Sequence, residues 1–242
     1  RTQLRQWDSQ VSLLEPVAVD IETTGFHVDD RITVVGFYAE IGCHLFLNTF
    51  GRTADEEGLQ TEVGSIVASS VRLNVFESEE ELKQAVTEFM SSSVCSGNQM
   101  LVGYNAERWG GGFDFPFLRT RYACSGVAWP FKDIPYVDLY PVFKKRFCTS
   151  VEDGDKNDLV SVYKLFFGED ALDPDPFEDS SEAVSCATSG EFRELLLHNF
   201  ADVLKTHKLA DIKRTLELAI LAERYVPRSD FQMKNLSSPS SD

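Results

Sequence analysis

The sequence contains no long hydrophobic run and few cysteines. No stretch of about 18 consecutive apolar residues occurs, so a membrane-spanning helix is not expected. Residues 1–10 are polar, unlike the apolar centre of a secretory signal peptide. The cysteines stand far apart without a C-x-x-C pair, at Cys43, Cys95, Cys124, Cys148 and Cys186. We therefore expect reduced thiols, no membrane partner and a cytoplasmic protein.

Positive charge is also scarce. The chain has 23 Lys and Arg residues against 39 Asp and Glu residues, which gives a formal net charge of -16. Nucleic-acid-binding proteins are usually basic, so the bulk charge by itself argues against that class. The simplest interpretation is a solubilising surface, although acids spread along the whole chain also suit a cytoplasm of high salt concentration.

The length of 242 residues is enough for one domain with a sizeable core. We expect this domain to cover residues 1–226. A flexible C-terminal tail is expected over residues 227–242, because its end is rich in Ser and Pro.

The apolar patterns predict strands first and helices later. Three strands that follow one another as antiparallel neighbours are expected at 13–20, 31–39 and 43–49, a buried parallel strand at 100–104 and an extended stretch at 134–138. Helices are expected at 79–92, 113–124, 139–146, 158–167, 181–187, 191–206 and 211–225, and a surface loop at 51–64. This order is typical of an α/β protein with a mixed sheet and helices on both faces.

Two acids at the end of the first expected strand are the first candidate site. Asp20 and Glu22 are separated by one residue, so they lie on the same face of a strand. Two carboxylates held this close repel each other unless a proton or a cation lies between them, and Mg²⁺ prefers such oxygen ligands. Thr23, Thr24 and Gly25 follow, and these small residues leave room for a substrate backbone. The alternative is a half-buried strand end whose acids are only solvated.

A glycine-rich turn before a helix is the second candidate site. Asp114 follows the glycines at 110–112, which allow a ligand to approach the backbone closely. Its alternative role is structural, because an acid at this position can bind the free N–H groups of the helix. Tyr104, Trp109 and Phe113 either stack on bases or pack in the core.

A histidine and an acid late in the chain are the third candidate site. His198 and Asp202 are four residues apart and share one face of a helix. An ordinary surface pair is the alternative. His207 and Asp211 have the same spacing, but we expect them in a helix-end region and favour the first pair.

These segments, in this order, resemble the three exonuclease motifs of the DEDD superfamily of 3′-5′ exonucleases. The motifs read V-D-I-E-T-T, then Y-N-x-x-x-W-G-G-G-F-D-F-P-F-L, then H-N-x-x-D-V, and the middle one is most similar to the exonuclease domains of family B DNA polymerases. The resemblance implies a ribonuclease H-like mixed five-stranded sheet with helices on both faces. It places the family's metal-binding acids at Asp20, Glu22, Asp114 and Asp202.

The same resemblance implies the chemistry. His198 takes the place of the residue that orients or deprotonates the attacking water, although its spacing from Asp202 is that of the family's tyrosine subclass. Two Mg²⁺ or Mn²⁺ ions would support hydrolysis from a 3′ end with release of nucleoside 5′-monophosphates. The expected substrate-binding residues are Thr23, Thr24, Tyr104, Asn105 and Phe113.

The expected partner is nucleic acid, either single-stranded DNA or DNA 3′ ends, with RNA as an alternative. DNA repair or replication partners are not identified by the sequence. Other readings are a ribonuclease of the same fold or a catalytically silent module that binds nucleic acid or protein. Candidate phosphate contacts, most of them expected to be solvated surface, are Arg108, Arg119, Arg121, Lys144, Lys145, Arg146, Lys205 and Lys208.

Overall fold

The computed structural model describes residues 14–40, 42–67, 70–94, 99–107, 111–132, 134–149, 157–177, 179, 181–211 and 233–234. Its strands are β1 (Glu15–Thr23), β2 (Ile32–Ala39), β3 (Gly42–Asn48), β4 (Val71–Phe76), β5 (Gln99–Gly103), β6 (Tyr136–Asp138) and β7 (Met233–Lys234). Its helices are α1 (Glu56–Val67), α2 (Glu79–Phe89), the π-helix η2 (Met90–Val94), α3 (Asp114–Ser125), α4 (Leu139–Arg146), α5 (Leu159–Phe167), α6 (Ser181–Ser189) and α7 (Phe192–Asp211).

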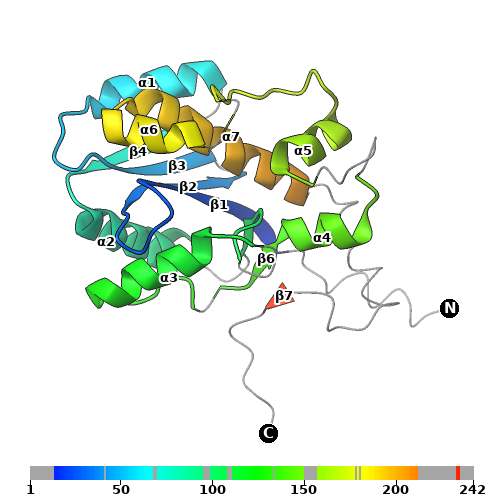
Figure 1. Ribbon diagram of the computed structural model, residues 1–242, viewed down its shortest axis with the longest axis horizontal. Coiled ribbons are helices and arrows are strands. Elements are labelled where there is room, and N and C mark those ends of the chain that lie inside the picture. Colours follow the sequence, from blue (N-terminus) through cyan, green and yellow to red (C-terminus); the bar gives the residue numbers. More distant parts are fainter. Residues whose placement is uncertain are drawn as a thin grey trace, which may run out of the picture.

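The strands form one mixed sheet in the order β4-β3-β2-β1-β5-β6-β7. The first three strands are antiparallel neighbours, as predicted, and β5 pairs with β1 in parallel. Helices α1, α6 and α7 cover one face of the sheet, and α2 and α3 cover the other (Figure 1). Helices α4 and α5 pack beside β5 and β6. The predicted α/β class with helices on both faces is confirmed.

The central strand β1 separates two apolar layers. Val17, Val19 and Ile21 belong to the layer formed with α2 and α3, whereas Ala18 belongs to the layer formed with α7. Because successive residues of a strand point to opposite faces, the residues at positions 20 and 22 share the α7 face with Ala18. The buried strand therefore directs its two acids toward α7.

The structure corrects the predicted number of strands. The predicted five-stranded sheet lacks β4 and the two-residue β7. The predicted surface loop at 51–64 is wrong, because helix α1 occupies most of that stretch. Only Val63 and Val67 of this helix are buried, so its apolar pattern is weak. The predicted helix at 211–225 and the tail at 227–242 lie almost entirely outside the described residues.

Other features agree with the sequence patterns. The described cysteines Cys43, Cys124, Cys148 and Cys186 are free thiols. Among the residues that the structure describes, none of the helices has the length and apolar character that crossing a membrane requires. Ser78 caps α2 by accepting a hydrogen bond from the Glu81 N–H at 3.3 Å, as its spacing predicts.

Candidate active site

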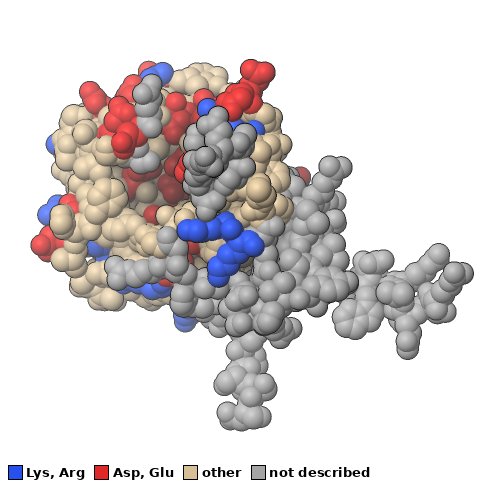
Figure 2. All heavy atoms as spheres, turned by 45° about the vertical axis from the view of Figure 1, so that its right-hand side comes forward, with Lys and Arg blue, Asp and Glu red and all other residues tan. Residues whose placement is uncertain are grey.

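Four acids from three elements line one cavity of about 470 Å³. Asp20 and Glu22 end β1, Asp114 begins α3 and Asp202 lies on α7. Figure 2 shows acidic side chains in and around a hollow, with a group of Lys and Arg side chains beside it. The segments that carry the predicted acids are far apart in the sequence, from Asp20 to Asp202. In the fold they meet at one cavity.

The chain reaches Asp114 through a tight connection after β5. Gly112 lies so close to Asn105 that a Cβ built on the glycine would come within 1.9 Å of the Asn105 carbonyl oxygen. The next residue, Phe113, is the N-cap of α3 and provides no side-chain capping bond. Asp114 occupies the first helical position and lines the cavity. The Asp114 carboxylate accepts a hydrogen bond from its own backbone N–H and faces the same cavity as the β1 pair.

Burial and neighbouring carboxyl groups raise the pKa values of Asp20, Glu22 and Asp114. Burial, and then the charges of Asp114, Glu22 and Asp202, hold the pKa of Asp20 well above its ordinary value. Burial raises the pKa of Glu22 to about 8, although the charge of His198 opposes the shift. Burial and then the charge of Glu22 also raise the pKa of Asp114. Such a cluster is costly to ionise, so a proton or a cation stabilises it.

The fourth acid has a different electrostatic environment. Burial raises the pKa of Asp202, while the charges of His198 and Lys205 oppose the shift. The Lys205 Nζ atom lies 3.4 Å from Asp202 Oδ1. This carboxyl group is therefore already partly neutralised by the protein, unlike Asp20 and Asp114.

Asn199 connects the acids of β1, a role that the sequence reading did not assign. Its Nδ2 atom donates to Asp20 Oδ2 at 2.9 Å and approaches Glu22 Oε1 at 3.5 Å. Its Oδ1 atom is buried, and among the described atoms it has no hydrogen-bond partner. The sequence pattern that could have identified Asn199 is its i,i+3 spacing from Asp202, which places both residues on one side of α7.

His198 is buried beside the acids. Its Nδ1 atom lies 2.8 Å from Asp175 Oδ1, and its Nε2 atom lies 3.9 Å from Glu22 Oε1 and 4.0 Å from Asp202 Oδ2. Burial alone would lower its pKa, but the Asp175 hydrogen bond and the charges of Glu22 and Asp202 outweigh burial and raise it to about 9. The Asp175 contact and the neighbouring carboxylates therefore favour the charged form of the imidazole.

A second set of possible ligands overlaps the first. The ligand atoms of Asp175, His198 and Asp202 all lie within 4.8 Å of one another. Asp175 belongs to a proline-rich stretch that was not among the candidate sites in the sequence. The chemistry of the site therefore extends beyond the four predicted acids.

Four of the five predicted substrate-binding residues line the acidic cavity, namely Thr23, Tyr104, Asn105 and Phe113. Thr24 does not line it, because its hydroxyl donates to Asp30 Oδ1 at 3.0 Å within the loop after β1. Asn105 has a positive φ of 54°, a conformation that Asn tolerates better than most residues.

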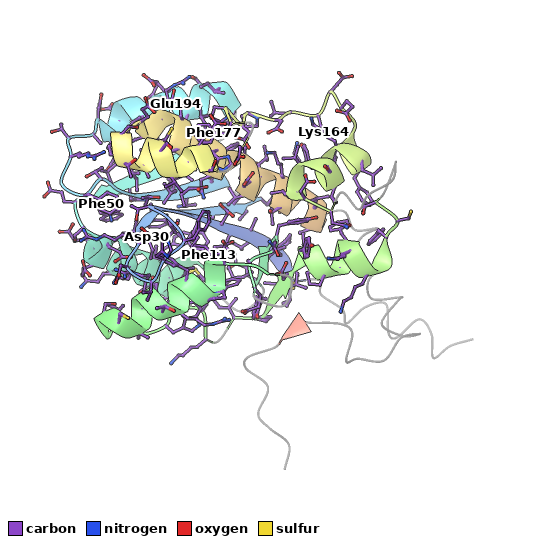
Figure 3. All side chains as sticks on the ribbon, in the orientation of Figure 1. Asp30, Phe50, Phe113, Lys164, Phe177 and Glu194 are labelled. Atoms are coloured by element: carbon purple, nitrogen blue, oxygen red, sulfur yellow. The ribbon has the colours of Figure 1, made fainter. Side chains whose placement is uncertain are left out.

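Aromatic rings form part of the cavity wall. Phe113 contacts Phe26 edge-on, with ring centroids 5.3 Å apart, and both line the cavity. Figure 3 shows Phe113 on the α3 side of the sheet and Phe177 on the α6 and α7 side. The Phe177 ring packs on His198 with centroids 5.0 Å apart.

Four of the eight candidate phosphate contacts are held by structural partners and are not among the residues that line the acidic cavity. Arg119 binds both carboxylate oxygens of Glu107, and Arg121 binds both of Glu79. Lys205 is fully buried, and Lys208 lies 3.3 Å from the Tyr163 hydroxyl. Arg108 and Trp109 lie outside the described residues, and the Arg146 side chain is not described.

Lys144 donates a hydrogen bond to the Tyr140 hydroxyl at 3.1 Å. Its side chain is nevertheless exposed and lines an adjoining cavity of about 440 Å³. That cavity shares Asp20, Tyr104, Asn105 and Asp202 with the acidic cavity. The neighbouring Lys145 is also exposed but is not among the lining residues.

The competing pair at His207 and Asp211 lies near the end of α7, as expected. The helix continues to Asp211, whereas its predicted end was at residue 206. His207 is buried with its ring 5.0 Å from the Tyr38 ring of β2. The His207 ring therefore packs against the sheet, while His198 faces the acids.

No protein-family model matches the sequence, and no curated protein matches it either. The chemistry of the site therefore has to come from the positions of the chain's own side chains within the α/β fold.

Proposed function

We propose that the protein is a metal-dependent 3′-5′ exonuclease with a ribonuclease H-like fold. The observation that carries the proposal is the meeting of Asp20, Glu22, Asp114 and Asp202 in one cavity. Because these acids arrive from β1, α3 and α7, the cluster cannot be a by-product of one acidic segment. DNA is the favoured substrate, and a single strand or a 3′ end would occupy the cavity. RNA is the alternative substrate.

The donor set fits hard divalent cations. Four carboxylates provide the oxygen ligands that Mg²⁺ and Mn²⁺ prefer. Burial raises the pKa values of all four acids, and the charges of neighbouring carboxylates add to each shift, so bound cations would relieve both penalties. When bound, a pair of such ions activates a water and stabilises the leaving 3′ oxygen of an in-line displacement.

His198 has a role that depends on the charge of its neighbours. With Glu22 and Asp202 ionised, the imidazole holds its proton more tightly, and its Nδ1 atom bonds to Asp175 Oδ1. Neutralising those two carboxylates removes two of the charges that raise its pKa, so the imidazolium gives up its proton more readily and the neutral form becomes available as a base. The imidazole is therefore suited to hold a proton at the cavity wall and to release it when the site is loaded.

The aromatic and basic residues that line the two cavities support binding of a nucleic-acid end, although the protein as a whole is acidic. Phe26 and Phe113 offer ring surfaces for base stacking, and Lys144 offers a cation for a phosphate in the adjoining cavity. The backbone N–H of Asn105 is held at 2.8 Å from Asp138 Oδ1, which fixes the turn between the two cavities. Attraction to phosphate is thus local and does not require a basic surface.

The direct test uses 5′-labelled and internally labelled DNA and RNA oligomers with Mg²⁺ or Mn²⁺, in low and high KCl. We expect a ladder that shortens from the 3′ end, with nucleoside 5′-monophosphates as products. Asp20→Asn and Asp114→Asn should each lower the rate by about a hundredfold or more, since each removes a ligand to the catalytic ions.

Asp29→Asn is the control, because Asp29 is an exposed acid in the loop between β1 and β2 and does not line the cavity. It should cleave like the parent protein. Binding without cleavage by the parent would instead indicate a silent module, and cleavage that persists in Asp20→Asn would rule out this site.

A further inference from the structure

A short proline-rich segment, Asp173–Pro174–Asp175–Pro176–Phe177, lies against α7 at the candidate site. We propose that Asp175 of this segment is a positioning residue that orients the His198 imidazole toward the acids. The inference rests on the proposed nuclease function for its consequence, although the orientation itself can be tested separately. We call residues 173–177 the strap.

The strap holds His198 by two contacts. Asp175 Oδ1 lies 2.8 Å from His198 Nδ1, and the Phe177 ring packs on the imidazole with centroids 5.0 Å apart. The same Asp175 oxygen accepts a hydrogen bond from the Phe177 N–H at 3.1 Å. The carboxylate and the aromatic ring therefore act on His198 from one locally ordered turn.

A buried lysine fixes the strap to α7. Lys205 is fully buried, and its Nζ atom lies 3.0 Å from Asp173 Oδ1 and 3.2 Å from Asp175 Oδ2. It also lies 3.4 Å from Asp202 Oδ1. Burying a lysine is costly unless its charge is compensated, so this ion cluster ties strap and helix together. The two prolines fix φ in the segment and reduce the number of conformations that it can adopt.

The geometry gives the imidazole one orientation. With Nδ1 bound to Asp175, Nε2 is the nitrogen left to face Glu22 and Asp202, at 3.9 and 4.0 Å. A flip of the ring would break the shortest contact and place carbon atoms toward Asp175. A carboxylate partner commonly fixes the proton position and orientation of a histidine in this way.

Asp175→Ala and Asp175→Asn test the inference, with Asp173→Asn as matched control. Asp173 shares the strap and the Lys205 contact, but not the contact to His198. Long-range ¹H–¹⁵N spectra read the imidazole nitrogens directly, and a His198→Gln variant assigns the signals. The spectra are recorded in EDTA, so this readout requires neither bound metal nor activity. Asp175→Asn keeps the shape of the side chain and serves if the alanine variant does not fold.

We expect Asp175→Ala to lose the downfield Nδ1–H resonance of His198, and Asp175→Asn to shift it. Asp173→Asn should leave the resonance in place. In the nuclease assay, kcat of Asp175→Ala should fall about 10- to 100-fold with KM close to that of the parent, as for other residues that orient a catalytic group. Asp173→Asn should retain most of kcat.

An unchanged His198 resonance in both Asp175 variants would overturn the inference. So would a loss of Mn²⁺ binding in Asp175→Asn as large as that in Asp202→Asn, because Asp175 would then be a metal ligand. If the parent protein cleaves no nucleic acid, the proposed function fails, while the spectra still decide whether Asp175 orients His198.

Discussion

The Oδ1 atom of Asn199 occupies the space above Gly36 that a side chain at position 36 would need. A Cβ built on Gly36 would come within 1.9 Å of this oxygen. Gly36 is the β2 partner of Asp20, so the absence of a side chain allows the Asn199 amide to reach Asp20 across the sheet. The glycine is therefore part of the site, although it carries no functional group.

Gly36→Ala should destabilise the protein and move Asn199 away from Asp20. An added methyl group in a packed core costs about 1–3 kcal/mol. The measurement is the free energy of unfolding from urea denaturation.

A double-mutant cycle provides the control. In an Asn199→Ala background the added methyl group has room, so Gly36→Ala should cost less there. Equal costs in the two backgrounds would show that the two residues do not compete for this space.

Glu22→Gln should make the metal-free protein less sensitive to rising pH. The pKa of Glu22 is raised from 4.5 to about 8, so in this interval the folded protein binds more protons than the unfolded chain. Its stability therefore falls as pH rises through the interval. His198, raised from 6.5 to about 9, adds a loss of the same sign. Glu22→Gln removes the first contribution, which unfolding in EDTA at several pH values measures.

Divalent ions should reverse the effect of the same substitution. Near pH 8 in EDTA, Glu22→Gln should melt at a higher temperature than the parent, because a repelling charge is gone. With Mn²⁺ the parent should gain more stability than the variant, since it has the additional ligand. Equal gains for both proteins would argue against Glu22 as a ligand.

Lys144→Ala should weaken binding of single-stranded DNA without changing kcat greatly. Lys144 lines the cavity beside the acids, and losing one phosphate contact should reduce the slope of log affinity against log salt by about 0.7. Binding is measured by fluorescence anisotropy in EDTA. Lys145→Ala is the matched control, and an equal effect of both substitutions would mean that only overall charge matters.

Arg119→Ala should affect stability and leave the salt slope unchanged. Its guanidinium holds buried Glu107, which also accepts a hydrogen bond from the Tyr136 hydroxyl at 2.7 Å. Leaving this carboxylate without its charged partner should cost about 1–3 kcal/mol. Arg72→Ala is the comparison, because Arg72 is exposed and should cost about 0.5 kcal/mol or less. Urea denaturation and the same anisotropy assay distinguish the two effects.

The sequence predicted well those features that depend on local pattern. The alternation around β1 places Asp20 and Glu22 on one face because its apolar neighbours are buried on the other. The capping residue of α2 and the bounds of α4 also follow from neighbouring residues. Such features need no knowledge of distant contacts.

Contacts between distant segments were not predictable in the same way. The partnership of Gly36 with Asn199 depends on the register of β2 and on the packing of α7, which no local pattern encodes. Asp175 was not identified as a site residue, since its partners His198 and Lys205 are over 20 positions away. Helix α1 was missed because few of its residues are buried.

Titration of Mn²⁺ followed by electron paramagnetic resonance of the free ion tests most directly whether the four acids form one metal site. We expect saturable binding by the parent, a large loss in Asp20→Asn and in Asp114→Asn, and binding like the parent's in Asp29→Asn. Parent-like binding in both Asp20→Asn and Asp114→Asn would contradict the metal site and, with it, the nuclease proposal.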